Sequence, residues 1–318
     1  MRAVSSRMRG PSNGWPKRPA RAYLPRHDGV VCTVINGFAE SAPCHRFRGV
    51  RDAVAGCAEP TYQVKLLLDP ATVLDADGRP LAGPAAALRL AGAVGFESAQ
   101  YVDDERLSLA AQRWIIRMRR DGDEDRIRLT YKTRFAIEGD GADPAAVQRA
   151  LDIAGAVNFG ANDTNYVPQV NLGLARATLD FCNKKREPAP HLAPGELPGP
   201  EASRALARDR MPGKLRKWSP KPPGWAESVA ANSLVYGPVR QTNHGGRLLG
   251  RALEMQVTPL RTGPGEPAWF AEITAKAATL REAVDLRSHL IAALRPQGWL
   301  LEREAFKTDL ILAPRPRP

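Results

Sequence analysis

Between residues 113 and 135 the chain alternates cationic and apolar side chains along two neighbouring segments. In the first run, RWIIRMRR, Arg117 and Arg119 stand two residues apart. In the second, RIRLTYKTRF, one parity holds Arg126, Arg128, Lys132 and Arg134, and the other holds Ile127, Leu129, Tyr131 and Phe135. Because successive side chains of a strand point to opposite faces, the pattern predicts strands over 113–120 and 126–135, joined as a hairpin by the acidic, Gly-bearing turn DGDEDR.

The cationic face of this hairpin has two interpretations. An antiparallel sheet commonly buries one face and wets the other, so Arg and Lys are ordinary residues on the solvated face, and this is the more frequent case. In a closed barrel the interior positions also alternate along every strand, and a wide barrel can hold a ligand. Cations that converge inside such a barrel repel one another unless an anion joins them. The hairpin alone leaves the two interpretations open.

The same patterning predicts further elements after residue 58. Strands are expected at 61–69, 97–103, 165–173, 176–184, 233–239, 247–260 and 268–277, and the chain closes with FKTDLILA, 306–313. Helices are expected at 143–155, which opens with Asp and Pro, at 200–211, and at 279–295, where apolar residues keep helical spacing. Eight or nine strands with about three helices favour an α+β fold, an antiparallel sheet closed on itself with helices packed outside.

Charge is distributed unevenly along the 318 residues. The net charge is +12 and the pI about 9.9, and residues 1–60 supply about half of the excess. Residues 1–58 also lack sustained periodicity, so we expect a disordered basic N-terminal extension, which fits a transit peptide or a start codon placed too far upstream equally well. The remainder is only mildly basic, which argues against nucleic-acid binding by the folded part. Nucleic-acid binding through the basic arm is kept as a weaker alternative.

The sequence also indicates the cellular compartment and whether the chain spans a membrane. No apolar run reaches the roughly 18 residues that a membrane span needs, so no membrane partner is expected. Cys32, Cys44, Cys57 and Cys182 show no CxxC or His-paired spacing, which supports neither a zinc site nor a disulfide framework. A reducing compartment, the cytoplasm, is the simplest expectation.

Several motifs together resemble the CYTH superfamily, the triphosphate tunnel metalloenzymes that include thiamine triphosphatases, inorganic triphosphatases and class IV adenylate cyclases. The resemblance begins with Tyr101, Asp103 and the Arg117-Met118-Arg119 triplet. It continues through LTYK (129–132), LEMQV (253–257), FAEITAK (270–276) and FKTDLIL (306–312). The chain looks most like the CYTH-like proteins of actinobacteria and fungi, and the resemblance implies a tunnel domain over residues 59–314.

This resemblance implies an eight-stranded antiparallel barrel whose inward Lys and Arg hold a triphosphate and whose inward acids hold Mg²⁺ or Mn²⁺. The division is chemically sensible, because cations around a tunnel neutralise a polyanion and divalent metals need hard oxygen ligands. The matching phosphate-binding positions are Lys65, Arg117, Arg119, Lys132 and Lys307, the last on the final strand, with Lys276 as a weaker addition. Arg126, Arg128 and Arg134 have the right parity but lie near the hairpin ends, where solvent can reach them.

The acidic positions depart from the family pattern. The family's first strand reads Glu-x-Glu-x-Lys, and here Thr61 and Gln63 replace both carboxylates while Lys65 remains. The later Glu-x-Glu strand is Glu254-Met255-Gln256. A Gln amide carries no charge and binds Mg²⁺ weakly compared with a carboxylate. The metal site is therefore expected to be impaired.

The acids left as candidate metal ligands are Glu254, Glu272 and Asp103, and the two Glu are also the candidate catalytic residues. Each has an ordinary structural alternative: a cross-strand ion pair for the two Glu, and a turn cap for Asp103.

Two function classes follow for the tunnel. In the first the protein is a slow, metal-dependent phosphohydrolase, with Glu254 and Glu272 holding the ion and a metal-bound water as nucleophile. In the second it is a non-catalytic protein with a degenerate metal site that binds a polyanion or nucleotide. The missing carboxylates favour the second. The expected partner in both is a triphosphate-containing small molecule or polyphosphate, and the sequence does not give the oligomeric state.

Overall fold

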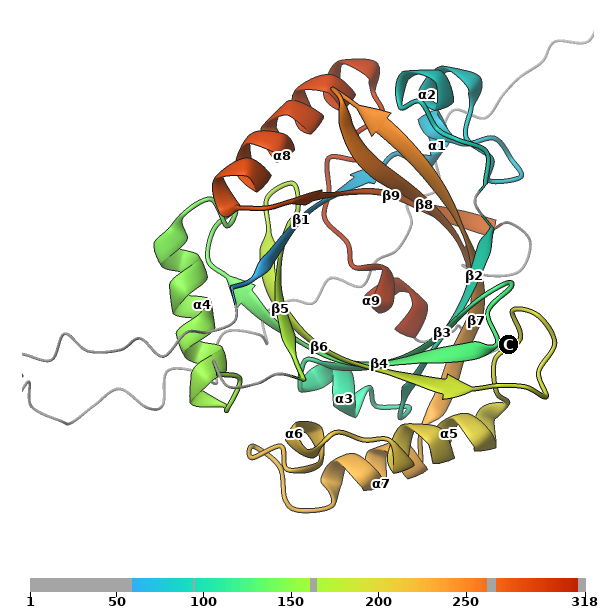
Figure 1. The fold of residues 1–318 in the computed structure, drawn as a ribbon, viewed down its shortest axis with the longest axis vertical. Helices are drawn as coiled ribbons and strands as arrows, with labels where there is room; N and C mark the ends of the chain where they lie inside the picture. Colours follow the sequence, from blue (N-terminus) through green and yellow to red (C-terminus); the bar gives the residue numbers. More distant parts are fainter. Residues whose placement is uncertain (1–58, 94, 161–164, 262–266, 314–318) are drawn as a thin grey trace, which may run out of the picture. The chain divides into compact units, whose positions relative to one another are not determined.

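The computed structural model describes residues 59–93, 95–160, 165–261 and 267–313. The predicted N-terminal extension, residues 1–58, lies outside these ranges. The described chain is an α+β fold, in which strands close into a barrel and most helices lie outside it (Figure 1). This confirms the predicted class and the closure of the sheet.

The barrel contains nine strands. They are β1 (Thr61–Leu68), β2 (Phe96–Asp103), β3 (Trp114–Asp121), β4 (Arg126–Ile137), β5 (Val167–Leu172), β6 (Ala177–Pro188), β7 (Leu234–Leu248), β8 (Arg251–Arg261) and β9 (Pro267–Ala277). Their order around the wall is β1-β5-β6-β4-β3-β2-β7-β8-β9, and β9 closes back onto β1. The pair β1 and β5 is parallel, whereas the other neighbours are antiparallel. The prediction of eight antiparallel strands was therefore wrong in number and in part of the pairing.

The segment 247–260 was predicted as one strand, but the chain reverses inside it. Leu249 and Gly250 both have positive φ, 52° and 76°, and they join β7 to β8. Two consecutive residues with positive φ are typical of a tight hairpin turn, which usually carries Asn-Gly. A Leu in the first position hides this turn from a sequence pattern.

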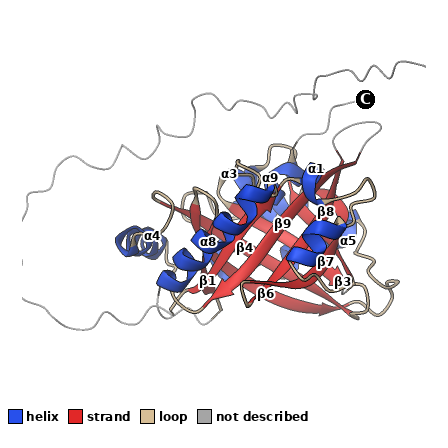
Figure 2. Cartoon of the chain, turned by 90° about the horizontal axis from the view of Figure 1, so that it is seen from above, coloured by secondary structure: helices blue, strands red, loops and turns tan. Residues whose placement is uncertain are grey.

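Helices cover the outside of the barrel (Figure 2). α4 (Pro144–Ala156) packs against β4 and β6, α8 (Leu280–Leu294) against β1, β5 and β9, and α5 (Pro200–Asp209) and α7 (Trp225–Ala231) against β2. The two long predicted helices begin at side-chain caps, because Asp143 accepts from the amide of Ala145 and Thr279 accepts from the amide of Glu282.

Shorter helices fill the connections. They are α1 (Pro70–Val73), α2 (Ala82–Ala87), α3 (Ser108–Ala111) and α6 (Gly213–Arg216), with a 3₁₀ turn at Arg295–Gln297. None of the helices that the structure describes has an apolar stretch long enough to cross a bilayer.

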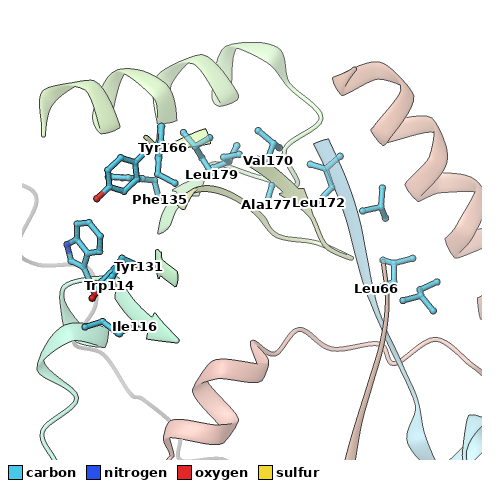
Figure 3. Close-up of a cluster of buried hydrophobic side chains, with 14 of the residues drawn as sticks. Leu66, Trp114, Ile116, Tyr131, Phe135, Tyr166, Val170, Leu172, Ala177 and Leu179 are labelled. Atoms are coloured by element: carbon cyan, nitrogen blue, oxygen red, sulfur yellow. The ribbon is translucent and has the colours of Figure 1, made fainter. Parts of the chain in front are cut away.

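The hydrophobic core lies between the barrel wall and these helices. The apolar parity of the strands points outward, and Leu66, Ile116, Tyr131, Leu172 and Leu179 are almost completely buried there (Figure 3). Each such side chain contributes about 1.5–3 kcal/mol when it leaves water. The apolar side chains of each strand pack against the helices, so the polar side chains that alternate with them face the barrel interior.

The closing segment is a helix rather than the predicted last strand. α9 (Lys307–Leu312) lies within the ring of strands in the view of Figure 1. Leu310 and Ile311 pack against the inward side chains of Leu67, Leu260 and Phe270. Its side chains thus fill the end of the barrel where β1 and β8 terminate. Short apolar runs of this kind do not distinguish helix from strand by periodicity.

Candidate anion site in the barrel

The barrel encloses a cavity of about 990 Å³ whose lining is strongly cationic. Among the described residues, eleven Lys or Arg side chains and four Asp or Glu side chains belong to this lining. The cations are Lys65, Arg117, Arg119, Lys132, Arg134, Arg176, Lys184, Arg247, Arg251, Lys276 and Lys307. The acids are Asp180, Glu254, Glu272 and Glu304. The alternation in the predicted hairpin thus marks an interior face, not a solvated outer one.

Most of the predicted site residues meet in this cavity. All six predicted phosphate-binding side chains line it, and so do both candidate catalytic acids, Glu254 and Glu272. Asp103 does not belong to the lining. Of the three extra hairpin cations, Arg134 lines the cavity, Arg128 is held in ion pairs, and Arg126 is exposed beside Asp125.

Asp180 organises the cations on the β4–β6 wall. Its carboxylate makes ion pairs with Lys132 and with Arg134, the latter at 3.0 Å, and accepts a hydrogen bond of 2.8 Å from Asn171. Burial alone would raise the pKa of Asp180, but the charges of Lys132 and Arg134 lower it. Sequence patterning missed Asp180, although its alternation with Thr178 and Cys182 on β6 offers the same inward parity.

Burial lowers the pKa of Lys132 on β4. Desolvation lowers the pKa of Lys132 to about 8, although the neighbouring carboxylate of Asp180 acts in the opposite direction. The positive charge of Arg134 adds to the lowering. An anion bound beside Lys132 would favour its protonated form.

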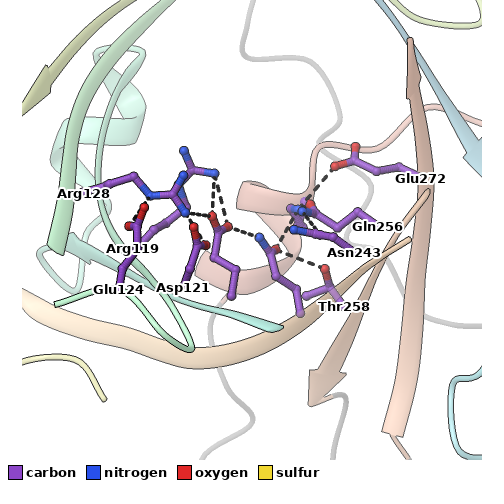
Figure 4. A network of polar contacts seen from close by, with 11 residues as sticks. Arg119, Asp121, Glu124, Arg128, Asn243, Gln256, Thr258 and Glu272 are labelled. Carbon is purple, nitrogen blue, oxygen red and sulfur yellow. Dashed lines mark hydrogen bonds and ion pairs between the residues drawn. The ribbon is translucent and has the colours of Figure 1, made fainter. Parts of the chain in front are cut away.

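A second acidic centre, Glu97, holds cations of β3 and β4. Its carboxylate lies 3.1 Å from the guanidinium of Arg119 and 2.6 Å from that of Arg128, and Arg128 also pairs with Asp121. Burial and the charge of Arg117 lower the pKa of Arg119 to about 10, despite Glu97. Glu97 also accepts from the amide of Gln241, its directly paired neighbour on β7, which extends this cluster along the wall toward β8 (Figure 4).

Three lining cations on β1, β3 and β9 have no carboxylate partner. No ion pair or hydrogen bond joins Lys65 or Lys276 to a residue in the described ranges. Arg117 is hydrogen-bonded to the phenol of Tyr101, and although burial lowers its pKa, Tyr101 and the charge of Glu97 raise it overall. Glu272 acts on Lys65 and Glu97 acts on Arg117 electrostatically without an ion pair, so the described residues compensate the positive charge of these groups only in part.

Glu272 and Lys307 form the third polar centre. The ammonium of Lys307 lies 3.3 Å from a carboxylate oxygen of Glu272 and 3.0 Å from the side-chain oxygen of Gln241. It also donates to the side-chain oxygen of Gln256, whose amide donates to Asn243 at 2.8 Å. Burial would raise the pKa of Glu272, but Lys65 and Lys307 lower it to about 2, so the carboxylate is ionised at neutral pH. Figure 4 shows the chain of contacts running from Arg128 to Glu272.

The donor set does not fit a Mg²⁺ or Mn²⁺ site. In the part of the chain that the structure describes, no three His, Cys, Asp or Glu side chains lie close enough together to hold a metal. Glu272 faces the ammonium of Lys307, and Glu254 is exposed without an ion-pair partner among described residues. Divalent metals of this type usually need carboxylates that are not neutralised by a cation.

Asp103 has the structural role that was its alternative in the sequence. Its carboxylate accepts hydrogen bonds of 2.9 Å from the amides of Asp104, Leu109 and Ala110, so it caps the turn that leads into α3. Burial nevertheless raises the pKa of Asp103 to about 6, because it outweighs these backbone hydrogen bonds.

Comparisons with known proteins find likeness in solved structures. No family model matches the chain, and no curated protein matches it. A candidate adenylyl cyclase of Hippeastrum, described as having a dominant triphosphatase activity, is 14% identical with a TM-score of 0.46, over 80% of this chain and 97% of its own. A candidate adenylate cyclase of Bacillus halodurans is 10% identical with a TM-score of 0.41, over 78% and 95%. One of Vibrio parahaemolyticus is 11% identical with a TM-score of 0.37, over 80% and 100%.

Proposed function

We propose that this chain is a CYTH-like tunnel protein that binds a triphosphate or similar phosphate polyanion inside its barrel, without a divalent metal. The observation that supports the proposal is the excess of cations among the described residues that line the cavity, eleven against four acids. The cations in this cavity that have no carboxylate partner among described residues attract an anion. Phosphate groups suit it, because they accept several charge-assisted hydrogen bonds at once.

The size of the cavity leaves room for more than a triphosphate chain. Ligand pockets span about 300–1,000 Å³, and the volume here, about 990 Å³, lies at the upper end. A triphosphate carrying an organic group, or a short polyphosphate, fits this range. The unpaired ammonium groups of Lys65 and Lys276 would contact the phosphate oxygens, while Arg117 offers a planar fork.

The metal-dependent phosphohydrolase is the less favoured alternative. Glu272 is neutralised by Lys307, and Glu254 has no second carboxylate with which to share an ion. We therefore assign no hydrolytic step to Glu254 or Glu272. The nucleic-acid alternative concerns residues 1–58, outside the described ranges, and stays a prediction.

A matched pair of substitutions on β6 tests where the polyanion binds. Lys184 lines the cavity, whereas Lys185, the next residue, points to the opposite face of the same strand. Both variants lose one positive charge, so general electrostatic attraction changes equally. We expect Lys184→Ala in the full chain to weaken tripolyphosphate binding, measured by calorimetry, and Lys185→Ala to leave it unchanged. Equal losses in both variants would mean that the anion binds to the outer surface.

A further inference from the structure

Three side-chain oxygens converge on one point beside α9. They belong to Glu272 of β9, Gln256 of β8 and Gln241 of β7, three consecutive strands of the barrel wall. Glu272 and Gln256 are directly opposite each other in the pairing of β8 and β9. One carboxylate and two amide carbonyl oxygens are hard donors of the kind that bind cations.

The occupant of this point is the ammonium of Lys307. It contacts all three oxygens, at 3.3 Å for Glu272 and 3.0 Å for Gln241, with the Gln256 contact shorter still. The Lys307 side chain is about one-tenth exposed, and so is that of Glu272. Lys307 is the first residue of α9, so the helix carries the cation to this position.

We call the three oxygens around Lys307 the oxygen cage. Its net charge of one negative is balanced by one monovalent cation. Glu272 supplies one negative charge, and Lys307 supplies one positive charge. Lys65 and Lys132 also act on Glu272 electrostatically, so a further positive charge at this point would be repelled. The neighbouring amide of Gln256 is held by Asn243, which keeps its oxygen directed at the ammonium.

We propose that the ammonium of Lys307 is the resident cation of the barrel, which occupies the oxygen cage in place of a divalent metal. α9 then has a role beyond filling the end of the barrel, because it places the ammonium that contacts Glu272 directly. Two substitutions should convert the cage into a metal site: removal of the ammonium and replacement of Gln256 by a carboxylate. This inference concerns the cage alone and does not require that a polyanion binds.

The test is Mn²⁺ binding, followed by electron paramagnetic resonance on the full chain without any phosphate compound. The variants are Gln256→Glu, Lys307→Met and the combination of both, since Met keeps the length of the Lys stem without its charge. We expect the combination to bind Mn²⁺ at least about tenfold more tightly than the wild type, because a like charge at contact distance is removed and a carboxylate added. Gln256→Glu alone should gain much less, because Lys307 still fills the cage.

Wild-type protein and Lys307→Arg, which keeps the positive charge, decide the question even if the combined variant does not fold. Neither should bind Mn²⁺ in a way that depends on Glu272. Mn²⁺ binding by the wild type that is lost in Glu272→Gln would overturn the proposal. So would a folded combined variant, by circular dichroism, with no gain in Mn²⁺ affinity. Failure of polyanion binding would instead affect only the proposed function.

Discussion

Two walls of the same cavity carry cations in different ways. On the β4–β6 wall, Lys132 and Arg134 are both paired to Asp180. On the β1–β9 wall, Lys65 and Lys276 have no ion pair with any described residue. A cation held by a buried acid has a fixed position and little uncompensated charge, whereas an unpaired cation keeps its full attraction for an anion. The Asp180 cluster therefore fixes the positions of its cations, whereas the cations without an ion pair among described residues, which include Lys184 on β6, supply most of the positive potential.

The largest loss of stability is expected from removing Asp180, which pairs with both cations of the first wall. Asp180→Ala leaves two largely buried cations without their carboxylate, although Arg134 still lies over the ring of Phe306, and breaking a buried pair in this way typically costs about 3–5 kcal/mol in the free energy of unfolding. Urea denaturation measures the loss. As the matched change on the second wall, Lys276→Ala removes an exposed, unpaired charge and should stay within about 0.5 kcal/mol of the wild type. Equal losses would contradict the distinction between the walls.

Removal of Lys65 from the second wall should weaken anion binding and leave stability nearly unchanged. Hydrogen bonds to charged groups contribute about 1.5–3 kcal/mol, so Lys65→Ala should weaken tripolyphosphate binding roughly 10- to 100-fold. Calorimetry gives the affinity, and thermal unfolding without ligand should change little. Unchanged affinity together with lower stability would show that Lys65 has a structural role only.

The lowered pKa of Lys132 should make polyanion binding at the first wall depend on pH. The pKa is lowered to about 8, so above this pH the unliganded protein loses the charge, and binding an anion must first restore it. Affinity for tripolyphosphate should therefore fall as pH rises through about 8, by up to roughly tenfold per pH unit. Lys132→Arg keeps its charge and should flatten this dependence. A wild-type affinity that is constant from pH 7 to 9.5 would contradict the role of Lys132 in binding.

The stability contribution of Lys132 has the opposite sign. In the unfolded chain a Lys keeps its proton to about pH 10.4, whereas the folded protein releases it near pH 8. The unfolded state thus binds more protons between these values, and stability from this group rises with pH across the window. Urea midpoints of the wild type and Lys132→Arg, compared from pH 7.5 to 10, measure the difference.

The smallest effect is expected at Glu254. It is exposed and lacks an ion-pair partner in the described chain, so Glu254→Gln should change the free energy of unfolding by less than about 0.5 kcal/mol. Tripolyphosphate affinity should stay the same or rise slightly, because a negative charge leaves the cavity. A large loss of affinity that appears only in the presence of Mg²⁺ would point to a metal-holding role instead.

The sequence predicted the barrel more accurately than the contacts inside it. Alternation on β3 and β4 identified the inward cations, because one apolar face must pack against the helices. The turn at Leu249–Gly250 escaped prediction, since Leu is not a turn residue, and α9 escaped it because its apolar run is too short to show a period. The pairing of Lys307 with Glu272 could not be predicted from the sequence for a further reason. The two residues are 35 positions apart, and they are in contact only because α9 lies inside the closed barrel.

Binding of tripolyphosphate to the full chain in the presence of EDTA, measured by calorimetry, tests the central claim most directly. The account predicts saturable binding with the chelator present, with an affinity that excess Mg²⁺ does not raise. Binding that appears only when Mg²⁺ or Mn²⁺ is added, or no binding under either condition, would contradict a metal-independent anion site inside the barrel.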